Sequence, residues 1–315
     1  MRIITAEELN KTMENAEIFT ANSFSREGYI AELLRFQRFA SELVVGDGEA
    51  RMDEVIAVLS GACRRNGAVH NANFALGLRA LKDIEKDLAI LMSGKNSEER
   101  VAHSLSFVTR KYFRNYQNVY VTEQYAETEL DDVVLTDKGI IIIEVKAAKN
   151  NITISSDGRL LYANGESYHN ESIGDKMSAK RRLLKSCIEA KLAERGLDIP
   201  VLIDSYIVFD CPGYMSVSVT DNFRREHWCR RGKLQFLVSE FTSDVTYSNE
   251  ALEQLEEILA DMENNAKRYP IDLDLRVIRQ RFAMLYELAS DSVAAETQNI
   301  YIDQELSEAG RTAVA

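Results

Sequence analysis

The sequence contains few cysteines, and none of them is paired for a metal or redox site. There are four, Cys63, Cys187, Cys211 and Cys229, and no two of them form a CxxC motif. Reduced thiols in a cytoplasmic protein are the simplest interpretation, because stable disulfides are uncommon in that compartment. Residues 1–10 also lack the basic and apolar segments of a secretory signal. We therefore expect a cytoplasmic protein.

The sequence also lacks a long apolar run and an excess of basic residues. No apolar stretch approaches the ~20 residues that a membrane-spanning helix needs, so we expect no membrane partner. Lys and Arg number 38 against 50 Asp and Glu, and the net charge of −12 argues against a protein that coats itself with nucleic acid. A Ser-His-Asp order, a phosphate-binding loop and a GxGxxG motif are absent, which removes support for triad hydrolases, NTPases and dinucleotide-binding enzymes.

The 315 residues divide into three regions by their periodicity. Apolar residues make up 45% of the chain, enough for a substantial core. Helical spacing predicts an all-helical N-terminal region, 1–93, and a helical C-terminal region, 246–315. Between them, 94–245 reads as a mixed α/β domain: after a helix with Ser97 as its N-cap, the apolar period changes from 3.6 to 2. The strands and the long helix expected in this domain are 118–123, 129–135, 140–147, a hairpin over 152–162, a basic helix over 172–196, and strands over 200–209, 216–220 and 234–241.

The stretch from Glu129 to Lys146 carries the strongest functional signal. It predicts two apolar strands joined by a turn at Asp137-Lys138-Gly139, with charged residues at the strand ends. A tight two-residue turn would place Asp131 directly opposite Glu144, whereas a bulge at Gly139 would bring Asp132 there instead. The spacing alone leaves both alternatives open. Charged residues at the ends of such apolar strands conflict with a purely structural role.

Two opposed carboxylates on one face of a sheet require a cation or a proton between them. Directly opposed residues have Cβ atoms ~4.5–5.5 Å apart, so Asp131 and Glu144 would repel each other. Carboxylate oxygens are ligands that Mg²⁺ and Mn²⁺ prefer. Lys146 projects from the same face as Glu144 and could orient a water or offset charge on a phosphate. These are the parts needed for metal-assisted phosphodiester hydrolysis; a surface ion-pair ladder is the plainer alternative.

In these residues the chain resembles the nuclease-related domain, NERD, of the PD-(D/E)XK nuclease superfamily. The family has an Asp at the end of one strand and Glu-x-Lys at the end of the next, matched here by Asp131, Glu144 and Lys146. Its helical Gly-Glu-x-x-Val signature corresponds to Ser97-Glu-Glu-Arg-Val101, so Glu98 would be a further carboxylate near the metal. Ser97 replaces the glycine, Asp132 stands where histidine is common, and the family's tryptophan and glutamine motifs are missing. The resemblance implies a restriction-endonuclease-like mixed sheet flanked by helical regions.

Basic residues cluster in the predicted helix that follows. Lys176, Lys180, Arg181 and Lys185 could hold a nucleic-acid backbone, although a solvated helix face is the alternative. A second cluster runs from Arg224 to Lys233 and includes Trp228, which could add base stacking, although a solvated loop is also consistent with it.

The resemblance implies a Mg²⁺- or Mn²⁺-dependent nuclease acting on nucleic acid, DNA before RNA, with roles in DNA processing or anti-phage (antiviral) defence. The acidic helical flanks would then bind a protein partner or mediate self-association. The alternative is a non-catalytic nucleic-acid- or protein-binding subunit that retains a nuclease-like fold; the charge of −12 and the missing glutamine motif favour it.

Overall fold

The computed structural model describes residues 4–21, 23–123, 126–147, 151–162, 164–167, 172–211, 216–217, 227–263 and 269–290. It separates into two compact units. The first combines Met1–Met92 with Arg268–Ala315, and the second is Ser93–Lys267. In the described parts of both units, every helix is too short or too polar to cross a bilayer.

The described residues of the first unit form helices and the loops between them. They are α1 (Ala6–Asn15), α2 (Arg26–Val44), α3 (Met52–Arg65), a short 3-10 helix (Ala68–His70), the first part of α4 (Ala72–Leu105) and a helix over 275–290. The capping box predicted at Thr5 is confirmed, since Glu8 N donates to Thr5 Oγ1 and Thr5 N donates to Glu8 Oε2. Buried aromatic residues from α2 and the 275–290 helix share one core, and Phe36 meets Phe282 edge to face.

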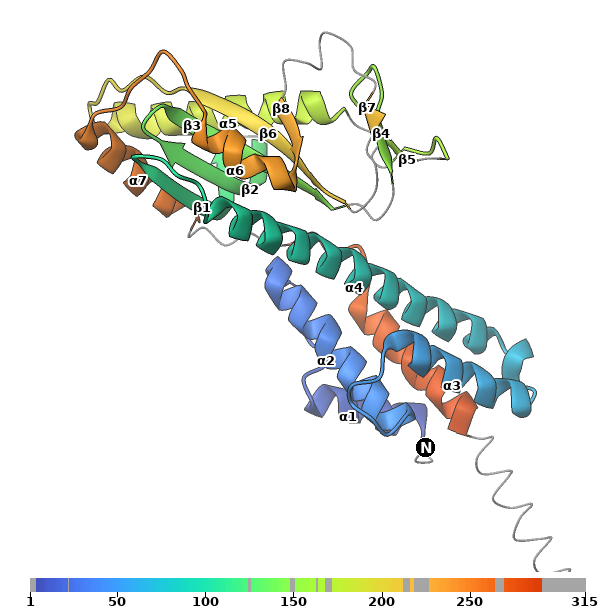
Figure 1. Ribbon diagram of the computed structural model, residues 1–315. Helices are drawn as coiled ribbons and strands as arrows, with labels where there is room; N and C mark the ends of the chain where they lie inside the picture. Colours follow the sequence, from blue (N-terminus) through green and yellow to red (C-terminus); the bar gives the residue numbers. More distant parts are fainter. Residues whose placement is uncertain are drawn as a thin grey trace, which may run out of the picture. The chain divides into compact units, whose positions relative to one another are not determined.

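The second unit contains a five-stranded mixed sheet with the order β1-β2-β3-β6-β8. β1, β2 and β3 are antiparallel, whereas β3, β6 and β8 are parallel (Figure 1). A smaller sheet has the order β5-β4-β7. The bounds are β1 (Phe113–Glu123), β2 (Ala126–Thr136), β3 (Gly139–Ala147), β4 (Ile152–Ile154), β5 (Leu160–Tyr162), β6 (Ile203–Asp210), β7 (Ser216–Val217) and β8 (His227–Arg230). The predicted mixed α/β, nuclease-like core is therefore confirmed.

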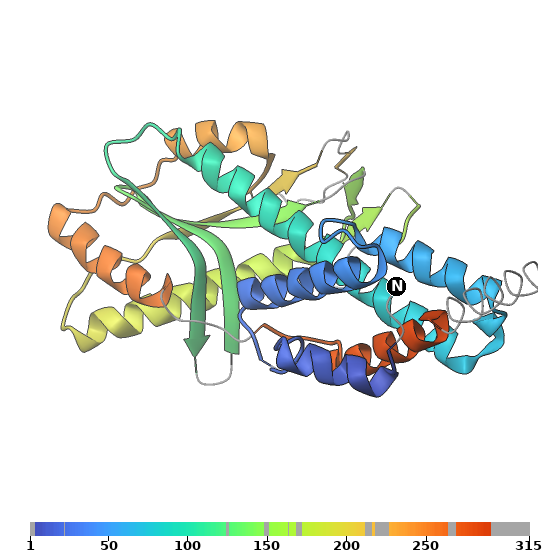
Figure 2. The same ribbon diagram turned by 90° about the horizontal axis from the view of Figure 1, so that it is seen from below.

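Helices cover both faces of the larger sheet. On one face, Ile140 and Ile142 of β3 contribute to a core with α5 (Ile173–Glu194) and α7 (Asn249–Glu263). On the other, Ile141 and Ile143 join a core with the end of α4 and α6 (Arg231–Ser239). This two-sided burial explains why the run from Ile140 to Ile143 is uniformly apolar rather than alternating. Figure 2 views the same layers from below.

Two sequence predictions about helices were wrong. No break occurs around Ser93, because α4 continues without interruption through Gly94 and Ser97, so Ser97 is not an N-cap. Packing of Leu91 and Val101 on either side of this segment offsets the ~1 kcal/mol that a mid-helix glycine costs. Residues 231–239 form α6 rather than a strand.

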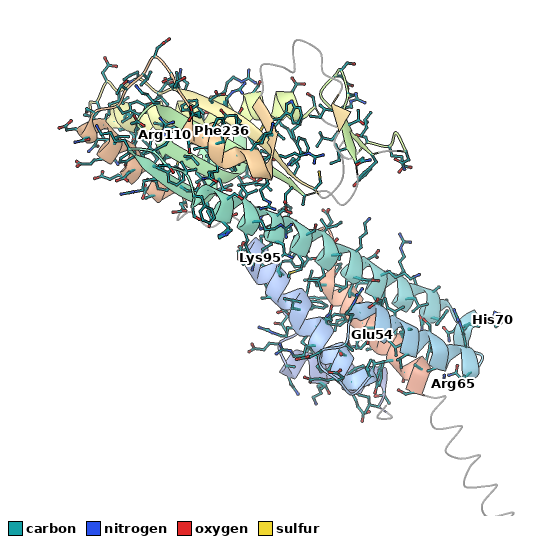
Figure 3. All side chains as sticks on the ribbon, in the orientation of Figure 1. Glu54, Arg65, His70, Lys95, Arg110 and Phe236 are labelled. Atoms are coloured by element: carbon teal, nitrogen blue, oxygen red, sulfur yellow. The ribbon has the colours of Figure 1, made fainter. Side chains whose placement is uncertain are left out.

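The burial pattern of α6 gives the reason for the second error. Leu234 and Val238, four residues apart, are both fully buried, as one face of a helix requires. Phe236, labelled in Figure 3, is 66% exposed. An alternating strand would have buried Phe236 together with these two residues. The strand before α6, β8, was not predicted.

The C-terminal helices belong to different units, although we treated 246–315 as one region. α7 packs against β1 and shares the core of the sheet through Leu255 and Leu259. The 275–290 helix shares the core of the first unit, where Arg279 donates to Glu14 of α1 at 2.7 Å. The apolar face of α7 packs in the core of the sheet, and the apolar face of the 275–290 helix packs in the core of the first unit.

Candidate active site

The turn between β2 and β3 sets the register of the candidate site. The paired residues run from Thr136 opposite Gly139 to Asp132 opposite Ile143, so Asp137 and Lys138 form a two-residue turn. Gly139 has φ +148°, and a Cβ there would lie 2.7 Å from Leu202 Cδ2. The tight-turn register is therefore confirmed, and no bulge at Gly139 slips it.

Asp131 lies where β2 and β3 stop pairing. The ladder ends at Asp132, and the Asp131 carboxylate takes the place of the next backbone acceptor: Val145 N donates to its Oδ2 at 2.7 Å. Asn118, the residue of β1 beside Asp131, has φ +51°, so β1 is also irregular at this level. This local distortion holds the Asp131 carboxylate against β3, where it contacts Val145, the residue that follows Glu144.

Asp132 points to a different environment. It is fully buried, and Asn115 Nδ2 donates to its Oδ1 at 2.8 Å. Its paired residue, Ile143, belongs to the core beneath α4 and α6, whereas Ile142, two positions before Glu144, belongs to the core beneath α5. Since side chains alternate along β3, Glu144 projects toward α5. Of the two aspartates, Asp131 is the one whose carboxylate reaches β3 beside Glu144.

Two lysines enclose the Glu144 carboxylate, which is only 6% exposed. Lys146 Nζ donates to Oε1 at 2.6 Å, and Lys180 Nζ, from α5, donates to Oε2. Lys180 also donates to the carbonyl of Glu129 at 2.9 Å. The sequence favoured Lys180 as a backbone-holding residue, with a role for Lys176 or Lys180 at the metal site as the alternative; the Lys180 ammonium lies at the carboxylate site.

The two carboxyl groups titrate in opposite directions. Burial raises the pKa of Asp131, the negative charge of Glu144 raises it further, and the two lysines only partly counter this. Burial also acts to raise the pKa of Glu144, but the ammonium groups of Lys146 and Lys180 outweigh it and lower that pKa. One carboxylate is thus held ionised while its neighbour is pushed toward its protonated form, a pattern that clusters at functional sites.

Glu98, on α4, adds to the negative electrostatic potential around the two aspartates. Its negative charge acts to raise the pKa values of both Asp131 and Asp132, so it lies within electrostatic range of both. Across the residues that the structure describes, no three His, Cys, Asp or Glu side chains converge closely enough to hold a metal ion. Asp131 and Glu144 are the two carboxylates of this site that could hold a divalent cation. This fits Mg²⁺, which is commonly bound by one or two carboxylates together with waters and substrate phosphate.

The other predicted nucleic-acid contacts do not form one surface. Arg181 Nη1 donates to the buried Ser205 Oγ at 2.7 Å, so Arg181 faces the sheet. Lys176 and Lys185 are exposed on α5, but their nine-residue separation turns them about half a revolution apart. Trp228 of β8 packs against Phe209, with ring centroids 6.4 Å apart, and joins the core beneath α5. Arg224 and Arg225 lie outside the described residues.

Sequence reasoning missed a second charged group at the end of β6. Asp210 accepts hydrogen bonds from Arg100 of α4 and from Arg231 of α6. These residues are separated by 110 and 21 positions, and no local pattern connects them.

Comparison with protein families identifies the segment that holds the carboxylate site and Asp210. The model of the nuclease-related domain matches residues 93–210. The chain contains a nuclease-related domain. The matched span runs from α4 to the end of β6 and includes Glu98, Asp131, Glu144, Lys146 and Lys180. No curated protein and no solved structure matches the chain, so nuclease-related function is the level of description that the family supports.

Proposed function

We propose that the nuclease-related domain hydrolyses phosphodiester bonds of nucleic acid with a divalent cation, Mg²⁺ or Mn²⁺. The observation that carries this proposal is the convergence of two buried, mutually repelling carboxylates with two lysine ammonium groups at one point of the sheet. DNA as the preferred substrate, and a role in DNA processing or antiviral defence, rest on the family resemblance.

Asp131 and Glu144 would hold the cation. When bound, it would supply charge for the scissile phosphate and an activated water. Burial and the charge of Glu144 raise the pKa of Asp131, and the positive charge of a bound cation would act against both and favour the ionised carboxylate. Glu98 would add negative potential at the site.

Lys146 and Lys180 have a different part in the reaction. Their side chains are 16% and 14% exposed, so each ammonium is nearly enclosed but still open to solvent. An ammonium has three donors, and Lys180 uses two of them on Glu144 and on the carbonyl of Glu129, so a third can point at an anion. We assign Lys146 to orient the attacking water and support the phosphate, and Lys180 to bind a non-bridging phosphate oxygen.

A second candidate function is a binding subunit that does not cut. Both carboxylate oxygens of Glu144 already accept hydrogen bonds from lysines, which is also a self-sufficient structural ion-pair group. In that case the domain would bind nucleic acid or a protein partner without a cation.

A cleavage assay separates the two functions. Single- and double-stranded DNA and RNA are incubated with the full chain and EDTA, Mg²⁺ or Mn²⁺, beside Glu144→Gln and Lys146→Met. Glu189→Gln is the matched control, since Glu189 is an exposed carboxylate of α5 that pairs with Lys185. We expect metal-dependent cleavage that falls about 10²–10³-fold in both site variants and is unchanged in the control. No cleavage by the wild type supports the binding subunit, and cleavage that survives both substitutions refutes the assigned site.

A further inference from the structure

Asp210, the last residue of β6, holds two arginines from different helices. Arg100 Nε donates to Asp210 Oδ2 at 2.8 Å, and Arg100 Nη2 donates to the same oxygen at 2.5 Å and to Ser97 Oγ at 3.0 Å. Arg231 Nε donates to Asp210 Oδ1 at 2.8 Å. Asp210 is 10% exposed, so one nearly buried carboxylate fixes two guanidinium groups.

Most of the donors on these arginines remain available. Arg100 is 50% exposed and Arg231 is 39% exposed at the side chain. A guanidinium has five N–H donors, and within the described part of the chain Arg100 Nη1 and both terminal nitrogens of Arg231 have no partner. Two arginines against one aspartate leave a net charge of +1. Prepositioned, partly solvated guanidinium groups of this kind match phosphate oxygens well.

The location of Arg231 adds a second, independent reason to expect an anion. Arg231 begins α6, no acidic residue lies in its first turn, and Arg230 at the N-cap makes no side-chain capping bond. Lys233 also lies in this turn. The N-terminus of a helix carries partial positive charge, so cations are unfavourable there unless an anion binds. The sequence therefore places positive charge where the local structure disfavours it, as functional sites often do.

The arginine pair lies near the proposed catalytic carboxylates. β3 and β6 are parallel, and Glu144 is opposite Ile207 whereas Ala147 is opposite Asp210. Three residues of strand correspond to roughly 10 Å. Both groups are at the carboxyl ends of parallel strands, the edge at which ligands bind in open α/β sheets. Asp210 faces α4 and α6, so a ligand reaching both groups would pass over this edge. Because phosphates recur along each strand of a nucleic acid, one strand that crosses this edge could present one phosphate to the carboxylate site and another to the arginines.

We propose that Arg100 and Arg231, positioned by Asp210, bind a backbone phosphate of nucleic acid that flanks the scissile phosphate. This inference rests on the proposed function for its substrate class. Asp210 is a positioning residue: it orients both guanidinium groups and keeps them from repelling each other. The plainer alternative is an ion-pair group that only ties α4 and α6 to β6.

Salt-dependent binding of a labelled DNA duplex to the full chain in EDTA tests the proposal. We expect Arg100→Ala/Arg231→Ala to weaken binding at least about tenfold and to make the slope of log affinity against log salt shallower by about one, because the pair contacts one phosphate. Arg195→Ala is the matched control, because Arg195 is 35% exposed and also pairs with a carboxylate, Glu257 at 2.8 Å. The control should bind like the wild type.

The double variant Arg100→Lys/Arg231→Lys keeps both positive charges and serves as the test if the alanine variant does not fold. Thermal unfolding of this variant and of the wild type checks that both are folded. Because the double lysine variant retains both charges, we expect most of the salt slope to remain while affinity falls several-fold, since an ammonium cannot bind two phosphate oxygens as a guanidinium does. Wild-type affinity and slope in the double alanine variant, or no DNA binding by the wild type, overturn the inference. If the alanine variant does not fold, wild-type affinity in the double lysine variant overturns it.

Cleavage assays on the same proteins separate this inference from the proposed function. Metal-dependent cleavage by the wild type, with unchanged DNA binding in the double alanine variant, refutes the arginine site alone. Arginine-dependent binding without any cleavage refutes hydrolysis and leaves the phosphate site standing.

Discussion

The helical unit and the nuclease-related domain bury charge in different ways. In the helical unit, Glu32 is 4% exposed and its carboxylate accepts from Phe19 N at 2.6 Å and pairs with Arg35 at 3.1 Å. Arg279 is 7% exposed and donates to the carbonyl of Ile18 and to Glu14. Each buried charge faces an opposite charge and a backbone group of the segment before α2.

In the nuclease-related domain, buried charges of the same sign converge. Asp131 and Glu144 repel each other, and the ammonium groups of Lys146 and Lys180 donate to Glu144. Within the described structure, Asp132 Oδ2 is buried without a hydrogen-bond partner. The comparison shows that buried charge paired with its opposite organises a fold, whereas buried like charges store a cost that a ligand can relieve.

The largest expected effect is stabilisation of the wild type by Mg²⁺ or Mn²⁺. A cation that binds only the folded chain adds about 2.7 kcal/mol to the free energy of unfolding at a hundred times its Kd. We expect Asp131→Asn to lose this gain, because it removes half of the ligand pair, and Glu32→Gln in the helical unit to keep it. Thermal unfolding across a metal titration measures both. An equal gain in Asp131→Asn would place the cation elsewhere.

A smaller loss should follow when the structural carboxylate is removed. Glu32→Ala leaves the amide of Phe19 without its acceptor, and such a loss costs about 1–3 kcal/mol. Urea denaturation should show this lower stability, while the rate of cleavage below the unfolding transition stays near that of the wild type. A collapse of cleavage in folded Glu32→Ala would show that the helical unit takes part in the reaction.

The next effect is a pH dependence that comes from Asp132. Burial raises its pKa from 3.8 to about 7, so the folded chain holds this proton more tightly than the unfolded chain. Its contribution to stability is present below about pH 4 and is lost as pH rises toward 7, with a slope of at most about 1.4 kcal/mol per pH unit. Asp132→Asn should remove only the Asp132 share of this slope, and the slope that remains comes from Asp131, whose pKa is also raised by burial.

Measurements of that slope belong in metal-free buffer above about pH 5.5. There Glu144, whose pKa is lowered, is ionised in both states and adds no slope. Identical pH profiles for the wild type and Asp132→Asn would contradict the assigned protonation.

The smallest effect is expected on the exposed face of α5. Lys185 is 50% exposed and lies 3.7 Å from Glu189, and pairs of this kind contribute about 0.3–0.5 kcal/mol. Lys185→Ala should therefore change stability and cleavage little, in contrast to Lys180→Ala, which removes a buried partner of Glu144. A large effect of Lys185→Ala on DNA binding would restore the predicted basic helix surface.

Short-range features of the site were predictable from the sequence. The two-residue turn at Asp137 and Lys138 fixes the register of β2 and β3, and strand alternation then puts Glu144 and Lys146 on one face. The same applies to the capping box at Thr5. Such features depend on residues that are close in sequence, so a local pattern contains the information needed.

Tertiary structure decided the rest, because it depends on which faces meet. Lys180 reaches Glu144 across 36 positions, and Arg100 reaches Asp210 across 110. The choice between Asp131 and Asp132 came from the point at which β2 and β3 part, and the helix at 231–239 from burial of Leu234 and Val238. The sequence alone determined the pair of strands that carry the acidic residues and Lys146. The charged partners of the acidic residues came only from tertiary packing. Helix α5 on one face of the sheet supplies Lys180 to Glu144, and α4 and α6 on the other face supply Arg100 and Arg231 to Asp210.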